Sequence, residues 1–404
     1  MDEITIGARL RTLRRWRDMT QVEVAGLAGV SPSFLSMVET GHRPLDRRSH
    51  IAALASALKV SETDLVGGPH LGPDRLQSDP HRVIPALRNA LQTSSVDDPA
   101  VDRARPLPVL VREMARIEPL HQACDYSAVG KALPGIMEEL HCHVAAPADE
   151  ASHQAALETL VDACVCATFT AKDLGYGDLA HLAALRAQEA ARSLDDPVQL
   201  GKAAFVRIHS LPRTGARDRM LAQAENAAGD LEPHATDPLG FQVLGMLELT
   251  AALSAAVAQD EARAQDWLDE AARLAERVPE VPDESWMAFS ATNVGVWRVA
   301  VGVERGYSGG AVLELAEKVQ EGKLVGKQGR RAAFFADVGR GLAREPRTQR
   351  DAIRWLRRAE DTAPQWIRNS PAVRGTVTYL LDRAITSAGG RELRGMAARI
   401  GVPH

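Results

Sequence analysis

The stretch TQVEVAGLAGVSPSFLSMVETG, residues 20–41, decides how the N-terminal part of the chain folds. Thr20 followed three positions later by Glu23 is the pattern of a capping box, which starts a helix. Gly29 allows a tight turn after that helix. Ser31-Pro32 then starts a second helix, because serine is a good N-cap and proline suits the first helical position. The stretch therefore predicts two short helices joined by a tight turn.

A predicted helix over residues 5–18 precedes this stretch, and another over residues 49–58 follows it. The first repeats apolar residues at helical spacing and carries five arginines: Arg9, Arg11, Arg14, Arg15 and Arg17. A turn capped by Ser61 and ending at residues 65–66 completes a predicted five-helix bundle.

The helix that starts at Pro32 has two different sides. At about 100° per residue, Leu35, Val38 and Glu39 share the side that is expected to be buried. The other side carries small polar residues and a methionine: Ser33, Ser36 and Met37, with Phe34 at the border. Such a helix fits the major groove of DNA, where hydroxyl groups bond to base edges and Phe34 or Met37 contacts a thymine methyl.

Residues 5–66 resemble the phage-repressor/Cro-like (xenobiotic-response-element) helix-turn-helix family over their whole length. The residues that carry the resemblance are Thr20-Gln21, Ala25, Ala28-Gly29-Val30-Ser31, Leu35 to Gly41, Arg43-Pro44, Leu54-Ala55 and Ala57-Leu58. The resemblance implies a domain that binds double-stranded operator DNA. Domains of this kind usually bind as homodimers to two half-sites about one helical turn apart.

The resemblance also implies roles for single residues. Gln21 would contact a DNA phosphate, and Arg43 with His42 would hold the DNA backbone. The residues at or near the base edges would be Ser31, Ser33, Phe34, Ser36 and Met37. Arg14 and Glu39 match a buried ion pair that holds helices together and contacts no base.

This chain departs from the family pattern in one respect. The outward positions of the third helix hold no Gln, Asn or Arg, so the strong bidentate contacts to bases are missing. Phosphate contacts and DNA shape are then expected to carry more of the specificity. The alternative is a five-helix bundle that binds protein instead of DNA.

Composition predicts an all-α protein. The chain has 404 residues, which suggests two or three domains, and only 4% of them are aromatic. Residues 1–66 carry a net charge of +1, and the rest carries −6. An acidic body argues against unspecific coating of nucleic acid. We expect a cytoplasmic protein without a membrane span, since there is no basic-then-apolar leader and no run of about 18 uncharged apolar residues.

Behind the first domain (1–66) we expect a linker rich in Gly and Pro (67–108), with one short helix over residues 83–92. Residues 109–404 are predicted to form successive helices. Segments rich in Ala, Leu and charged residues recur about every 40 residues: 178–194, 216–231, 261–277, 309–321 and 348–363. More apolar helices alternate with them, near 198–211, 238–258, 284–304 and 330–344. Paired helices at this period are typical of an α-solenoid.

The repeating region, roughly residues 150–404, resembles degenerate tetratricopeptide repeats. Small residues at packing positions carry this resemblance, as in Ala262, Ala264 and Ala271-Ala272, together with the proline of Ala363-Pro364. The stretch from Glu360 to Ala397 also resembles the C-terminal ends of actinobacterial repressor-like regulators. The resemblance implies a regulatory domain for sensing or oligomerisation.

The concave side of a solenoid suits a peptide or an extended ligand. On the predicted helix 284–304, one stripe holds Trp286, Ser290, Asn293, Trp297 and Glu304. The first four are the candidate ligand-binding residues. The alternative is that the tryptophans are ordinary core packing, and the same alternative applies to Phe334 and Phe335.

No metal, cofactor or enzymatic site is predicted. Cys164 and Cys166 would point about 200° apart on a helix, and the cluster His141-Cys142-His143 lacks the ligand spacing of a zinc site. The glycines near Lys323 and Lys327 lack the spacing of a phosphate-binding loop.

The sequence therefore predicts a DNA-binding transcriptional regulator whose helical domain senses a peptide or small molecule, or assembles a homodimer. The first alternative is a protein-interaction scaffold with a vestigial helix-turn-helix. An antitoxin is the second alternative. The sequence does not decide between repression and activation.

Overall fold

The computed structural model describes residues 6–60, 65–66, 79–211, 217–278, 286–384 and 390–402. Within these ranges the chain forms 20 α-helices and no strand, so the predicted all-α class is confirmed. The buried apolar side chains form two separate cores. One lies within residues 6–66, here called the N-terminal bundle, and the other within residues 84–402, here called the body.

The N-terminal bundle contains α1 (Ile6–Trp16), α2 (Gln21–Ala28), α3 (Pro32–Glu39) and α4 (Arg48–Ala57). One leucine from each of three helices is completely buried at its centre: Leu10, Leu35 and Leu54. Leu65 is also completely buried in this core. The Ser61 cap of the predicted fifth helix lies outside the described residues.

The body is a series of helices joined by short connections. It starts with α7 (Ile84–Thr93), α8 (Leu107–Gln122) and α9 (Tyr126–Ala145). The pairs that follow are α10 (Glu150–Asp173) with α11 (Gly177–Leu194), α12 (Pro197–Ser210) with α13 (Arg217–Leu231), α14 (Pro238–Val257) with α15 (Glu261–Ala275), α16 (Ala291–Arg305) with α17 (Gly309–Ala316), and α18 (Gln328–Ala343) with α19 (Gln349–Thr362). The short α20 (Pro364–Ile367), then α21 (Pro371–Ala384) and α22 (Gly390–Ile400), end the chain.

Several of these helices begin at an aspartate that caps them. Asp196 and Asp237 each accept a hydrogen bond from the backbone N–H three residues on, and each is followed by a proline in the first helical position. Asp149 and Asp260 cap α10 and α15 in the same way. The first residues of these helices are therefore set by neighbouring residues in the sequence.

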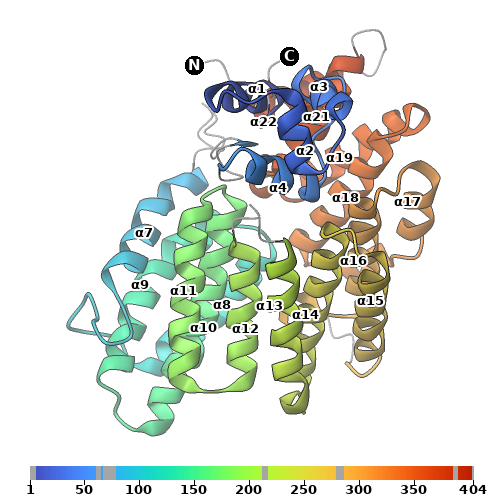
Figure 1. Cartoon of the computed structure of the whole chain (residues 1–404). Helices are drawn as coiled ribbons and strands as arrows, with labels where there is room; N and C mark the ends of the chain where they lie inside the picture. The colour runs from blue at the N-terminus through green and yellow to red at the C-terminus, as the bar shows by residue number, and fades with distance from the viewer. Residues whose placement is uncertain are drawn as a thin grey trace.

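The pairs stack side by side (Figure 1). Helices α10, α12, α14, α16 and α18 contact one another in that order and form an inner row, whereas α11, α13, α15, α17 and α19 form an outer row. The outer helices are the segments predicted from the repeat of about 40 residues, which places each pair where the sequence pattern indicated. The tetratricopeptide label itself stays a prediction.

Helix α14 lies in the middle of the inner row. It is long and apolar enough to cross a membrane, but 94% of its apolar window is buried inside the protein. Burial on nearly all sides explains its mostly apolar sequence, because a helix surrounded by other helices needs no polar face.

Part of the predicted linker belongs to the body. Ile84, Leu87 and Leu91 of α7 are buried in the large core, and α7 packs against α9 and α11. The short helix expected over residues 83–92 is therefore present, but it is an element of the core and does not lie in a free connection. Residues 67–78 of the predicted linker lie outside the described residues.

The predicted helix 284–304 is broken, which corrects the stripe proposed on it. Met287 and Ala288 have positive φ angles, and the hydroxyl of Ser290 then accepts the N–H of Asn293 to start α16. Trp286 and Ser290 thus precede the helix that carries Asn293 and Trp297. A wheel drawn through all of them does not describe their positions.

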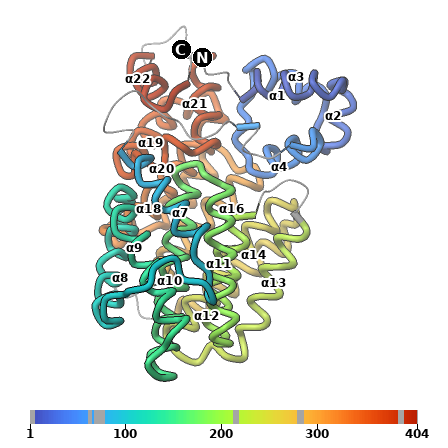
Figure 2. Tube along the Cα trace, turned by 90° about the vertical axis from the view of Figure 1, so that its left-hand side faces the viewer, coloured from blue at the N-terminus to red at the C-terminus, as the bar shows by residue number. Residues whose placement is uncertain are grey.

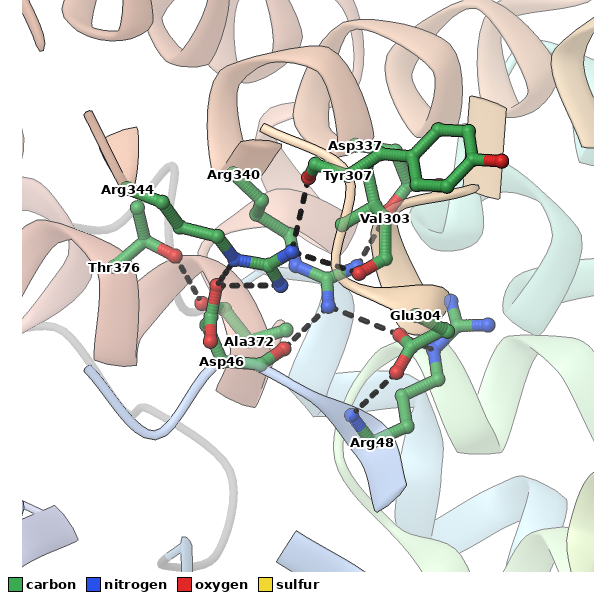
Figure 3. Close-up of polar contacts among 10 residues, drawn as sticks. All are labelled: Asp46, Arg48, Val303, Glu304, Tyr307, Asp337, Arg340, Arg344, Ala372 and Thr376. Atoms are coloured by element: carbon green, nitrogen blue, oxygen red, sulfur yellow. Dashed lines mark hydrogen bonds and ion pairs between the residues drawn. The ribbon is translucent and has the colours of Figure 1, made fainter. Parts of the chain in front are cut away.

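A buried cluster of charges joins the N-terminal bundle to the body (Figure 3). The guanidinium of Arg340 on α18 forms an ion pair of 3.0 Å with Glu304 of α16 and donates to the backbone carbonyl of Asp46. The Asp46 carboxylate in turn pairs with Arg344 at 3.0 Å. Glu304 also accepts the backbone N–H of Arg48, the first residue of α4, at 2.9 Å. The side chains of Arg340 and Glu304 are only 2% and 1% exposed.

Helix α21 supports the same junction. Gly375 lies so close to the bundle that a Cβ atom there would be 2.6 Å from the backbone oxygen of Leu45. A glycine is needed at this point because any side chain would push the bundle away. In Figure 1, α21 and α22 lie beside the bundle.

The charges of the cluster compensate one another. Burial on its own raises the pKa of Asp46 and Glu304, but the guanidinium groups of Arg344 and Arg340 outweigh it. Both carboxyl groups therefore keep a pKa below the usual range. Their contribution to stability is complete above the usual carboxyl pKa and is lost as the pH falls below it.

Replacing Arg340 tests the importance of the cluster. We expect Arg340→Met to lower the free energy of unfolding by about 3–5 kcal/mol, because Glu304 and Asp337 stay buried without their partner. Urea unfolding followed by circular dichroism measures the change. The control is Arg354→Met, since Arg354 is 75% exposed in a surface pair and should contribute less than about 1 kcal/mol. Equal effects of the two variants would contradict a structural role of the cluster.

Candidate nucleic-acid interface

Helices α2 and α3 are set at a fixed angle by their caps. The Thr20 hydroxyl accepts the N–H of Glu23, and the Glu23 carboxylate accepts the N–H of Thr20, which completes the predicted capping box. Gly29 has a φ of +64°, in the left-handed region that favours glycine, and ends α2. The Ser31 hydroxyl then accepts the N–H of Phe34 and starts α3. The turn predicted from the sequence is formed by these contacts.

Three side chains hold α1, α2 and α3 together. The Glu39 carboxylate receives two hydrogen bonds from Arg14, Nε to Oε1 at 2.6 Å and a terminal nitrogen to Oε2 at 2.9 Å. Gln21 Nε2 donates to Glu39 Oε2 at 2.9 Å. Burial raises the pKa of Glu39, but these hydrogen bonds and the charge of Arg14 outweigh it and keep the pKa below its usual value of 4.5. The expected Arg14–Glu39 contact is thus present, and Gln21 belongs to it.

The position of Gln21 bears on its predicted phosphate contact. A primary amide carries two N–H groups, and one of them is directed at Glu39. The second N–H is left for a phosphate group. The same residue can therefore link the buried ion pair to the DNA backbone, which would fix the angle between α2 and the duplex.

The remaining predicted contact residues lie on the surface of α3 and the loop after it. Ser31, Ser33, His42 and Arg43 are exposed, and Ser36 and Met37 are half-buried. His42 lies near Asp382 of α21, whose pKa is raised by burial and lowered in part by His42. An acidic neighbour weakens His42 as a phosphate contact, which leaves Arg43 as the main cation of this loop.

Phe34 differs from its prediction. Its side chain is only 6% exposed and packs edge-on against His50 of α4, with ring centroids 4.7 Å apart. The Arg43 guanidinium covers the ring, 5.1 Å from its centroid. Phe34 therefore packs inside the bundle and positions Arg43, and its ring does not face outward to contact a thymine methyl.

The outer side of the bundle faces away from the body. In Figure 2, α4 lies next to the body, whereas α2 lies at the edge farthest from it. The charge cluster holds the loop before α4 and the first turn of α4, not the outward side of α3. The face that carries Ser33 is thus left uncovered by the described part of the chain.

Comparison with known proteins agrees with this geometry. Residues 5–66 match a family described as "Helix-turn-helix domain", of the xenobiotic-response-element type. The N-terminal bundle is a helix-turn-helix domain. Neither a curated protein nor a solved structure matches the chain. The family match supports a DNA-binding regulator.

A cavity of about 570 Å³ lies between the helix-turn-helix domain and the inner row of the body. Its walls come from α10, α12, α16 and α18, and from the segment that joins α20 to α21. Arg48 and Ile51 of α4 line it from the other side. The volume is in the range of pockets that hold small ligands.

The four predicted ligand-binding residues are not brought together at this cavity. Trp297 lines it, but its neighbours in the prediction are used in packing. Trp286 is buried edge-on against Phe205, Ser290 caps α16, and Asn293 is completely buried with its amide near Met246 and Met287. Phe334 and Phe335 pack against Trp355 and do not line the cavity.

The contact between the cavity and α4 was not predicted from the sequence. The feature that could have indicated it is the run of adjacent charges Asp46-Arg47-Arg48, because charges directly before an apolar helix need partners once they are buried. The described residues contain no group of His, Cys, Asp and Glu suited to a metal ion. Cys164 and Cys166 are buried, and burial raises the pKa of the Cys164 thiol to about 12.

Glu39→Gln tests the buried ion pair of the helix-turn-helix domain. The variant leaves Arg14 without its carboxylate, so we expect the protection of α1–α3 amides from hydrogen exchange to fall by about 3 kcal/mol at pH 7. The pKa of Glu39 is lowered in the folded state, so its contribution is present above pH 4.5 and lost below it. Wild type and variant should therefore become alike in acid. Glu270→Gln, in a surface pair on α15, is the control and should leave these amides unchanged.

Proposed function

We propose that the chain is a sequence-specific transcriptional regulator that binds operator DNA through α2 and α3 and senses a signal with its helical body. The observation that carries the proposal is the pairing of a helix-turn-helix, whose outward side is uncovered, with a cavity that reaches α4 of the same domain. The division into a DNA-binding domain, a connection and a repeat domain is part of this proposal, as is a cytoplasmic location.

Base recognition in this proposal rests on α3. The hydroxyls of Ser33 and Ser36 would bond to base edges in the major groove, and Met37 would contact a thymine methyl. Gln21 and Arg43 would hold phosphates on either side. These contacts are fewer and weaker than bidentate ones, so we propose that the protein binds as a homodimer to two half-sites.

Signal sensing in this proposal depends on α4. The helix contributes Arg48 and Ile51 to the cavity wall, and its first backbone N–H is held by Glu304. A ligand in the cavity would therefore contact the helix-turn-helix domain directly. A change in how the two parts fit together would alter the relative placement of the two DNA-binding domains in a dimer.

Selection of random duplex DNA by the purified full-length protein tests the proposed function. We expect several rounds at about 150 mM salt to enrich a palindromic site with half-sites about 10 base pairs apart. The matched control is the variant Arg43→Ala with Gln21→Ala, which should enrich no site. The absence of enrichment by wild type, and equally by residues 1–66 alone, would refute sequence-specific binding and favour a protein-interaction scaffold.

Single substitutions separate phosphate contacts from base contacts. Arg43→Ala should weaken binding to all sequences alike and reduce the slope of log K against log salt by about 1. Ser33→Ala should leave that slope unchanged but alter the preferred base at one position of the half-site. Titrations of the selected site and its single-base variants at several salt concentrations measure both effects. If Ser33→Ala keeps the base preference and Ser36→Ala does so as well, the assigned face of α3 is wrong.

A further inference from the structure

The cavity wall contains a continuous belt of aromatic rings. Phe169 of α10 lies 5.9 Å, between ring centroids, from both Phe205 and His209 of α12. His209 in turn lies 6.3 Å from Trp297 of α16. His121 extends the belt at the other end, 6.1 Å from Phe169. Phe205 is completely buried and supports the belt from behind. Phe169, His209 and Trp297 offer a flat or bulky apolar molecule a surface for edge and face contacts.

An arginine stands at the Trp297 end of this belt. Cζ of Arg330, on α18, lies 5.3 Å from the centroid of the Trp297 ring. Within the described part of the chain its guanidinium forms no hydrogen bond and no ion pair. Burial lowers its pKa to about 10, an effect that attraction by Asp173 only partly offsets. Arg330 is half-buried, so its charge has lost part of its hydration, and a bound anion would compensate for that loss.

The other charges of the cavity wall are already paired. Lys172 lies 3.3 Å from Asp173, and Asp173 also accepts the hydroxyl of Tyr126 at 2.7 Å. Arg340 is bound by Asp337 and Glu304, and Arg48 is held by Glu304. Asp178 is exposed on the first turn of α11, where water screens it. Of the charged side chains described inside this cavity, Arg330 is therefore the one for which the described residues provide no hydrogen bond or ion pair.

We infer that the cavity binds a small organic acid: an aromatic or other bulky apolar body lies along Phe169, His209 and Trp297, and its acidic group pairs with Arg330. A planar guanidinium suits a carboxylate or sulfonate because it can donate two parallel hydrogen bonds. The volume of about 570 Å³ fits a molecule of this size. The inference rests on the proposed function, for which it names the class of signal.

Two fluorescent dyes with the same ring system test the inference on the full-length protein. The anionic dye is 1-anilinonaphthalene-8-sulfonate, and the neutral dye is N-phenyl-1-naphthylamine, which lacks the sulfonate. We expect Arg330→Met to weaken binding of the anionic dye by at least about tenfold and to change binding of the neutral dye by less than about twofold. Arg330→Lys keeps the charge and should restore most of the affinity for the anionic dye.

Two further variants fix the place and the cause of the effect. Ala333→Trp puts a large side chain into the cavity one turn from Arg330, and it should abolish the binding of both dyes. Arg354→Met removes an exposed arginine from α19 and should change neither. Arg330 forms no hydrogen bond or ion pair with the described residues, and methionine can keep an apolar contact with Trp297, so the melting temperature of Arg330→Met should change little.

Several results would overturn the inference. They are equal loss of both dyes in Arg330→Met, unchanged binding of the anionic dye in that variant, or unchanged binding of both dyes in Ala333→Trp. The dye titrations contain no DNA, so their result does not depend on whether the protein binds a specific DNA site. A protein that selects an operator but shows no charge-dependent dye binding keeps the proposed regulator and loses only the organic acid.

Discussion

The guanidinium of Arg340 connects three parts of the chain that lie far apart in sequence. It sits between Glu304 of α16, Asp337 of its own helix and the backbone carbonyl of Asp46, which precedes α4. A buried ion cluster of this kind contributes little net stability compared with apolar packing, but it is specific, because losing any member leaves another charge buried and unpaired. The helix-turn-helix domain is thus held in one orientation on the body, where apolar contacts alone would permit sliding.

In that orientation α4 lines the cavity on one side and packs against α3 on the other. Its first turn carries the N–H that Glu304 binds, Ile51 lines the cavity, and His50 packs against Phe34 of α3. In the proposed function, a molecule in the cavity and a DNA duplex on α3 would thus both lie against elements that α4 contacts directly. Coupling between such sites requires two arrangements that the ligands bind with different affinity. A second arrangement would have to part Asp46 and Arg48 from their partners on the body, but it would leave both apolar cores closed.

The helices and their pairing followed from the sequence because their signals are local. The capping box at Thr20 and the Ser31-Pro32 start each involve neighbours in the chain, and α2 and α3 begin where those signals lie. The period of about 40 residues indicated the outer helices of the pairs. The charge cluster did not follow, since Asp46 and Arg344 are 298 residues apart and no pattern in either segment names the other. The predicted stripe through Trp286 is wrong for a local reason. Ser290 is an N-cap that starts a new helix, but the apolar spacing on both sides of it suggested one continuous helix. The prediction that Phe34 faces DNA is wrong because it lies at the border between the two sides of α3. Whether such a side chain is buried depends on the neighbouring helix, here on His50 of α4.

The orientation of the helix-turn-helix domain on the body matters because the exposed side of α3 carries short serine side chains. Serine hydroxyls form single, short-reach hydrogen bonds, which succeed only if the helix lies at the correct depth in the groove. A long arginine or glutamine side chain would tolerate a shift of the domain that a serine does not. Depth and angle are set by the Arg14–Glu39–Gln21 contacts within the domain and by the Arg340 cluster behind it. If α3 binds bases as proposed, a domain with weak base contacts would depend more strongly on its placement than one with strong contacts, and the body would then influence DNA binding through that placement.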